Sequence, residues 1–219
     1  MEPNFWLERW DKGETGWHRE DVHPELITHW SALGIPPRSP VLVPLCGASL
    51  DMAWLANQGH EVIGVELSQS AVEQFLARHR VRHVVMDETG FRTYLGGRYQ
   101  LWCGDFFALP ADVFASAGAV YDRASLFAFP PDMRKRYAAT LSERLKPGTK
   151  ILLISLTYNE AEMEGPPFSV PDGEVRALFR DCFDITEIET TDVLARNEGL
   201  RKRGLTALTE TTYLLTRKS

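Results

Sequence analysis

The sequence predicts an α/β fold with a doubly wound, mostly parallel sheet of seven strands. The chain has 219 residues and 44% hydrophobic residues, which is enough for one large core. From Val41 onward, short apolar runs alternate with amphipathic segments, the pattern of strand–helix–strand units. The last two apolar runs follow each other with no long helical pattern between them. That arrangement favours an antiparallel pair that closes the sheet.

The elements are expected in a regular order. A helix around 50–58 follows the first strand, and Ser70 with Glu73 forms a capping-box pattern for the next helix. Pro131 begins a later helix, and residues 84–95 are expected to be a surface excursion. The seven strands are predicted at 41–45, 62–67, 99–103, 118–122, 151–156, 185–189 and 211–216.

The first forty residues differ in composition from the rest. They contain many large aromatic side chains, interleaved with charges: Phe5, Trp6, Trp10, Trp17 and Trp30. A helix carries Trp6 and Trp10 as i, i+4 neighbours, and glycines at 13 and 16 interrupt it. A short second helix starts at Pro24. We therefore expect one domain, 1–219, in which an N-terminal lid or cover segment (1–40) packs on a core (41–219), with Trp6 and Trp30 in plain core packing.

Composition limits the partners. The formal net charge is −6 and the pI is about 5.6, which argues against binding to nucleic acid or to an anionic membrane surface. The three cysteines at 46, 103 and 182 show no paired spacing, so we expect reduced thiols and a cytoplasmic protein. No apolar run approaches the roughly 18 residues of a membrane span. We expect a soluble monomer that acts on a small molecule.

Glu66 is the first candidate site residue. It ends the second predicted strand, about 20 residues after the Cys46-Gly47 turn, at the edge where parallel sheets bind ligands. A carboxylate there accepts hydrogen bonds from both hydroxyls of a ribose. The turn has one glycine rather than the three of a dinucleotide fingerprint, which favours S-adenosylmethionine over NAD. Cys46 itself is interpreted as a small buried hydrophobe rather than a nucleophile.

Two later strand ends carry further candidates. Asp105 is able to accept from an adenine amino group and Phe106 to stack on its ring, although an ordinary turn explains them equally well. Arg123 is placed to meet a carboxylate of a ligand or substrate, or else to pair with Asp122. There is no Ser/His/Asp set, phosphate loop or Cys/His metal spacing, and His18, His23 and His29 are interpreted as structural.

Four segments together resemble a known family. FWLERWDKGETGWH (5–18), VPLCG (43–47), GHEVIGVELS (59–68) and YDRASL (121–126) resemble the thiopurine S-methyltransferase family in its shorter bacterial form. The resemblance implies a Rossmann-like class I fold and methyl transfer from S-adenosylmethionine to sulfur of small aromatic thiols. Bacterial members are also linked to methylation of selenium and tellurium compounds.

The resemblance also implies roles for individual residues. It assigns the cofactor to Trp10, Leu45, Glu66, Asp105, Phe106 and Arg123. Trp17 aligns with an aromatic that faces the acceptor, and Arg123 is a second substrate contact. A further substrate-facing arginine is expected near the C-terminus, as Arg201, with Arg196 and Arg203 as alternatives. No catalytic acid or base is assigned.

Two other functions remain open from the sequence. An NAD-dependent oxidoreductase would use Glu66 in the same way, but the turn lacks its second and third glycines. A non-catalytic module that binds S-adenosylmethionine would leave the aromatic segment and Arg123 without a purpose.

Overall fold

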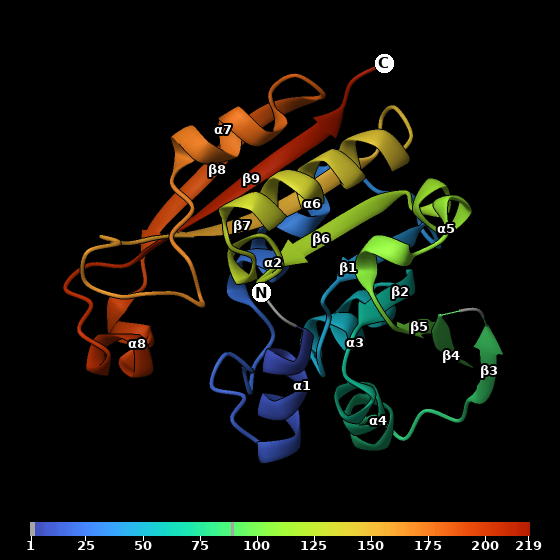
Figure 1. The fold of residues 1–219 in the computed structure, drawn as a ribbon. Helices are drawn as coiled ribbons and strands as arrows, with labels where there is room; N and C mark the ends of the chain where they lie inside the picture. Colours follow the sequence, from blue (N-terminus) through green and yellow to red (C-terminus); the bar gives the residue numbers. More distant parts are fainter. Residues whose placement is uncertain (1–2, 89) are drawn as a thin grey trace. The chain divides into compact units, whose positions relative to one another are not determined.

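The computed structural model describes residues 3–88 and 90–219 and has the α/β architecture that the sequence predicts (Figure 1). Residues 1–2 of the predicted lid and residue 89 of the predicted excursion lie outside the described residues. The chain divides into two compact units, Met1–Tyr121 and Asp122–Ser219. The prediction of a single domain over 1–219 stays a prediction.

The first unit contains the aromatic segment and six strands. Its elements are α1 (Pro3–Lys12), α2 (Pro24–His29), η1 (Trp30–Leu33), β1 (Pro40–Pro44), α3 (Leu50–Asn57), β2 (Glu61–Glu66), α4 (Gln69–Arg78), β3 (Val84–Glu88), β4 (Phe91–Gly96), β5 (Tyr99–Cys103), η2 (Phe106–Ala108), α5 (Ala111–Ser116) and β6 (Ala119–Arg123), whose last two residues belong to the second unit.

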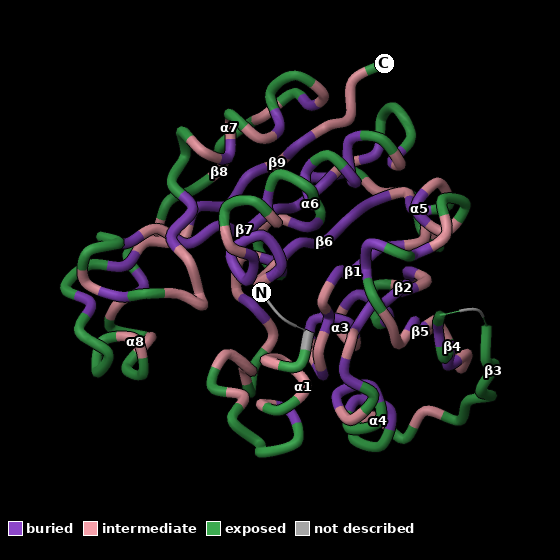
Figure 2. Tube along the Cα trace, in the orientation of Figure 1, coloured by how far each residue is buried: buried purple, intermediate pink, exposed green. Residues whose placement is uncertain are grey.

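The strands of this unit lie in the order β3-β4-β5-β2-β1-β6. β1 pairs in parallel with β2 and with β6, and β2 pairs in parallel with β5, so these four strands end at the same edge. Their middle residues are buried (Figure 2), as expected for apolar runs covered on both faces. Gly64 has a packing reason: a Cβ there would lie 2.7 Å from Leu101 Cδ2 and 2.9 Å from Cys46 Sγ.

Residues 84–95, expected to be a surface excursion, contain two strands that the sequence analysis did not predict. This segment forms the antiparallel hairpin β3–β4, and β4 pairs with β5. The sequence obscured it because β3 is exposed along its whole length and therefore lacks the alternation of a half-buried strand. With this hairpin, the described residues contain nine strands rather than seven.

The predicted N-terminus of α4 is wrong by two residues. The capping box predicted at Ser70 and Glu73 lies inside α4, and the N-cap is Ser68, whose Oγ accepts from the Ala71 amide at 3.3 Å. Helix α2 begins at Pro24 as expected. On this helix Leu26 is buried, whereas Ile27 is 52% exposed.

The second unit is built on an antiparallel sheet. Strands β7, β9 and β8 lie in that order and both pairings are antiparallel, which confirms the predicted terminal pair. The buried Arg134 side chain links α6 to the segment before α7, because Nη1 donates to Ser169 O at 3.0 Å and to Glu174 Oε2 at 2.8 Å. The elements are η3 (Leu126–Ala128), α6 (Pro131–Arg144), β7 (Lys150–Thr157), α7 (Asp172–Phe179), β8 (Phe183–Asp192), η4 (Leu194–Arg196), α8 (Glu198–Lys202) and β9 (Thr209–Arg217).

Within the described residues, no helix has the length and apolar character that crossing a membrane requires.

Candidate functional site

The turn after β1 is shaped by two residues in the left-handed region. Leu45 has φ +47° and Gly47 has φ +51°. For a leucine this conformation is an outlier, and such outliers concentrate at ligand sites. A Cβ on Gly47 would lie 3.1 Å from Cζ2 of Trp10, so the glycine leaves room for that indole. The aromatic segment and the turn therefore lie against each other.

The carboxylate of Glu66 is hydrogen-bonded to the same turn. Its side chain is buried, with Oε2 accepting from the Gly47 amide at 2.9 Å and Oε1 from the Ser68 amide at 2.8 Å. Burial raises the pKa of Glu66 from its ordinary value, while these backbone N–H groups act to lower it. A carboxylate has about four acceptor positions, so Glu66 retains capacity for a further donor such as a ribose hydroxyl.

The end of β5 lies beside Glu66. Glu66 is in register with Cys103, and the Gly104 amide donates to Glu66 O at 2.9 Å. Asp105 is exposed and caps η2, with Oδ1 accepting from the Phe107 amide at 3.0 Å. Phe106 is buried and packs edge-to-face on Phe114 at 5.3 Å between ring centroids. The structure thus places Asp105 at the same edge as Glu66, with Phe106 anchored in the core behind it.

The two thiols near this edge have raised pKa values. Burial raises the pKa of Cys46 well above its ordinary value, and the Glu66 carboxylate raises it further. Burial, with the same carboxylate adding to it, raises the pKa of Cys103 to about 11. A thiol needs to be a thiolate to act as a nucleophile. This supports the interpretation of Cys46 as a packing residue.

The tryptophans of the N-terminal segment form a cluster. Trp17 packs edge-to-face on Trp6 at 5.2 Å and on Trp10 at 6.2 Å between ring centroids. Trp10 is buried, whereas Trp17 and Trp6 are half-buried. The prediction of core packing is therefore wrong for Trp6, which packs on its neighbours in the segment. It is confirmed for Trp30, whose Nε1 donates to His60 Nε2 at 3.0 Å.

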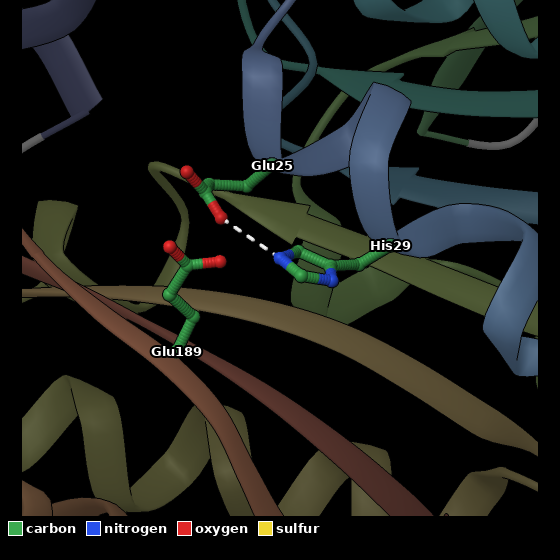
Figure 3. A group of neighbouring side chains, drawn as sticks. All are labelled: Glu25, His29 and Glu189. Atoms are coloured by element: carbon green, nitrogen blue, oxygen red, sulfur yellow. Dashed lines mark hydrogen bonds and ion pairs between the residues drawn. The ribbon is translucent and has the colours of Figure 1, made fainter.

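The three histidines of the segment have local structural roles. His29 contacts Glu25 one turn earlier on α2, with Nε2 and Oε2 3.1 Å apart (Figure 3). The His18 ring packs on Trp10 at 6.2 Å, and His23 is fully buried at the start of α2.

Sequence reasoning missed a buried carboxylate, Asp51. It lies in the first turn of α3 and is 2% exposed. Oδ1 accepts from the His23 amide at 2.8 Å, and Oδ2 accepts from the Tyr121 hydroxyl at 2.9 Å. Asp51 thus joins the entry of α2, the start of α3 and the end of β6. Because its partners are 28 and 70 residues away, no local pattern reveals it.

In the second unit, Asp122 organises the turn that carries Arg123. Asp122 is fully buried, and its Oδ2 accepts from the Tyr137 hydroxyl at 2.7 Å, while Oδ1 accepts from the Ser125 and Leu126 amides. Burial raises the pKa of Asp122, and these hydrogen bonds act to lower it. Ala124, next to Arg123, has φ +73°. Both oxygens of Asp122 are therefore used to shape the turn.

The C-terminal arginines differ in their surroundings. Arg203 donates to Pro166 O at 3.0 Å and to Glu164 O at 2.9 Å, so its guanidinium holds a loop. Arg196 and Arg201 are exposed, on η4 and α8. Within residues 3–88 and 90–219, the guanidinium of Arg201 has no hydrogen-bond or ion-pair partner. Of the three arginines, Arg203 is the one already held by the fold.

Comparison with known proteins identifies the family. The family model described as thiopurine S-methyltransferase matches residues 1–218. A protein named thiopurine S-methyltransferase from Pseudomonas entomophila (strain L48) is 46% identical over 217 residues, covering 99% of this chain and 100% of that one. One of the same name from Azotobacter vinelandii is 46% identical over 218 residues and covers 100% of both chains. The chain belongs to the thiopurine S-methyltransferase family.

Solved structures show the same fold at low identity. Burkholderia thailandensis 1,6-didemethyltoxoflavin-N1-methyltransferase has a TM-score of 0.68 at 19% identity, covering 99% of this chain and 87% of that one. A SAM-dependent methyltransferase from Anabaena variabilis also has a TM-score of 0.68, at 14% identity, covering 99% and 95%. The fold is that of class I S-adenosylmethionine-dependent methyltransferases.

This thiopurine S-methyltransferase family member is an enzyme whose cofactor is S-adenosylmethionine. The residues present fit that cofactor: Glu66 keeps acceptor positions for a ribose, and the single-glycine turn is closed by Trp10 rather than open for a diphosphate. The alternatives of an NAD-dependent oxidoreductase and of a non-catalytic module are not retained.

Proposed function

We propose that this enzyme transfers the methyl group of S-adenosylmethionine to the thiol of thiopurines or similar small aromatic thiols, and also methylates selenium or tellurium compounds. The family assignment supports the thiol acceptor. The observation that carries the proposal is the edge formed by Glu66, Gly47 and Trp10, which has acceptors for a ribose beside an aromatic cover.

We further propose the residues that bind each partner. Glu66 accepts from the ribose hydroxyls, Leu45 and Trp10 line the turn, Asp105 and Phe106 flank the adenine, and Arg123 completes the cofactor site. Trp17, Arg123 and Arg201 face the acceptor. The exposed position of Asp105 and the unoccupied guanidinium of Arg201 support these assignments.

The methyl transfer does not depend strongly on a general acid or a general base. The bound cofactor supplies an electrophilic methyl group on a cationic sulfonium, and an aromatic thiolate is already a good nucleophile. The protein then has to align the two and exclude water. The tryptophan cluster provides apolar cover and ring faces for a cation, and the thiols of Cys46 and Cys103, whose pKa values are raised, are poor competitors as nucleophiles.

We propose that the chain works as one domain in the cytoplasm, as a monomer with no nucleic-acid or membrane partner. The acidic net charge of −6 supports this.

The test is a screen with methyl-labelled S-adenosylmethionine against thiopurines, other aromatic thiols, aliphatic thiols, selenite and tellurite. We expect label on sulfur of the aromatic thiols, with weaker transfer to the selenium and tellurium compounds. Glu66→Gln should reduce every transfer together. Label on no chalcogen acceptor, in a protein that binds S-adenosylhomocysteine, would contradict the proposed acceptor class while keeping the cofactor.

A further inference from the structure

Helix α8 is a short element that its own packing does not hold in place. It spans Glu198–Lys202, and none of its five residues, all of which the structure describes, is buried. Isolated helices shorter than about 12 residues are marginal in water, and helices in proteins are stabilised mainly by burying an apolar face. Contacts at the two ends of α8 therefore have to fix its position. This position matters because α8 carries Arg201, the proposed acceptor contact.

The N-terminal end of α8 is tied to the core of the second unit. Nδ2 of Asn197, the residue before the helix, donates to Val193 O at 2.8 Å. The Val193 amide in turn donates to Leu208 O at 2.9 Å. Val193 and Leu208 are buried, directly after β8 and directly before β9. The start of α8 is therefore anchored where these two strands meet.

The C-terminal end of α8 is held by the loop between β7 and α7. Arg203, the residue after the helix, donates from Nη1 to Pro166 O at 3.0 Å and from Nη2 to Glu164 O at 2.9 Å. In the opposite direction, the Glu162 carboxylate accepts from Thr206 N at 2.8 Å and from Thr206 Oγ1 at 2.7 Å. We call these four hydrogen bonds, made by the side chains of Arg203 and Glu162, the α8 clip.

The same loop also reaches the turn that carries Arg123. The Phe168 amide donates to Phe127 O at 2.8 Å, and Phe127 lies on η3, directly after that turn. Ser169 fixes this end of the loop to the end of β7, because its Oγ accepts from Tyr158 N at 3.0 Å and donates to Tyr158 O at 2.8 Å. The loop therefore connects the Arg123 turn with α8, beside which it runs (Figure 1).

We propose that Arg203 and Glu162 are positioning residues of the acceptor site, which fix α8 relative to the Arg123 turn and so place Arg201 for the acceptor. This inference rests on the proposed contact of Arg201 with the acceptor. A guanidinium binds an anion through N–H groups in a fixed fork, so its backbone has to be held at a defined place. If α8 were loose, binding of the acceptor would have to order it, at a cost in affinity.

Steady-state kinetics of clip variants test the inference. Glu162→Ala and Arg203→Met should each raise the KM of a thiopurine acceptor about fivefold, with kcat and the Kd of S-adenosylhomocysteine nearly unchanged. Arg203→Lys, whose ammonium is still a donor for these carbonyls, should lie between Arg203→Met and the natural protein. Glu160→Ala, exposed in the same loop, and Lys202→Ala, whose Nζ pairs with Glu198 inside α8, are the matched controls and should leave KM unchanged.

A double-mutant cycle tests whether the clip acts through Arg201. Arg201→Ala should raise the acceptor KM about tenfold. Adding Arg203→Met to Arg201→Ala should change KM by less than about twofold, because the group to be positioned is gone. An unchanged KM in Arg201→Ala would remove the proposed acceptor contact, and this inference with it. A raised KM in Arg201→Ala beside an unchanged KM in both clip variants would overturn this inference alone.

Hydrogen exchange tests the clip without any acceptor. In Arg203→Met, the amides of 198–206 should exchange faster than in the natural protein, while those of β7 and β9 should keep their rates. The melting temperature should fall little, because the clip is exposed and water replaces its hydrogen bonds. Unchanged exchange over 198–206 would show that the clip does not fix α8 and would overturn the inference. Losses of cofactor affinity and melting temperature that parallel the rise in KM would also overturn it, since the clip would then be general scaffold.

Discussion

At the scale of single residues, Glu66 joins two loops and still has acceptor capacity left. Its two oxygens accept from the Gly47 and Ser68 amides, so the carboxylate positions the turn after β1, where we propose that the cofactor binds. The same burial that raises its pKa makes the remaining acceptor positions strong, because few water molecules compete for them.

Glu66→Gln should weaken S-adenosylhomocysteine binding about tenfold or more, because hydrogen bonds to a charged acceptor contribute about 1.5–3 kcal/mol. Glu61→Gln, at the other end of β2, is the matched control and should bind normally. Calorimetry measures both, and equal affinity in the two variants would remove the ribose role.

The raised pKa of Glu66 also predicts a pH dependence. Ribose hydroxyls favour the ionised carboxylate, so binding is constant above the raised pKa and weakens as pH falls through it. For folding the sign is opposite: stability from this group is full below the unfolded pKa and is lost as pH rises through the folded pKa. Proton release on binding in the acidic range, absent from Glu66→Gln, is the measurement.

Arg123→Lys should reduce methyl transfer at least about tenfold, or about 1.4 kcal/mol in the barrier, with little change in melting temperature. The reason is that the proposed ligand contacts use the planar fork of the Arg123 guanidinium, whose geometry an ammonium does not reproduce. Arg180→Lys, an exposed arginine of the same unit, should leave activity unchanged. Parallel losses of activity and stability would make Arg123 a scaffold residue instead.

At the scale of elements, the aromatic segment is held to the first unit at two points. Trp10 lies against Gly47, and the His23 amide is held by Asp51. Between them, the turn after α1 has Gly13 with φ +70°. We expect α1 to move about Gly13 when Trp10 leaves the turn after β1, while Asp51 keeps α2 anchored.

Hydrogen exchange should show this motion. Residues 3–20 should be better protected with S-adenosylhomocysteine than without it, while 24–33 should not change. In Gly47→Ala, the added Cβ meets Trp10 at a left-handed position, so ligand should no longer increase the protection of 3–20. Identical protection of 3–20 in both states of the natural protein would mean that the segment is permanently docked.

Asp51 connects three elements of the first unit, so its removal should be costly. Asp51→Ala leaves the buried Tyr121 hydroxyl and His23 amide without an acceptor, at about 1–3 kcal/mol each. Tyr121→Phe removes one hydrogen bond and should cost about 1 kcal/mol. Denaturant unfolding measures both free energies. A loss in Asp51→Ala no greater than in Tyr121→Phe would show that Asp51 does not join the elements.

At the scale of the whole molecule, the charge of −6 opposes the approach of an anionic thiolate. Raising ionic strength from about 10 mM to about 150 mM shortens the Debye length from about 30 Å to about 8 Å. The kcat/KM for a thiolate acceptor should therefore rise with salt, while that for a neutral acceptor should not. A fall in kcat/KM for the thiolate would show that local arginines dominate the field at the site.

Much of the architecture was predictable because it rests on local pattern. The strands β1, β2 and β7 are buried almost throughout because both faces are covered, and Pro24 and Pro131 begin helices at the positions expected. The hairpin β3–β4 was missed because an exposed strand has no hydrophobic period to read. The prediction of core packing for Trp6 was wrong because the burial of an indole depends on the tertiary neighbours that contact it.

The sequence by itself determined the α/β class, the strand-end position of Glu66 and the aromatic character of the N-terminal segment, because each depends on neighbours within a few residues. The tertiary structure decided what those residues contact. Glu66 bonds to Gly47 across 19 residues and Asp51 bonds to Tyr121 across 70, distances over which no periodicity carries information. Only folding brings such partners within hydrogen-bond distance, and only there do burial and geometry determine what each carboxylate does.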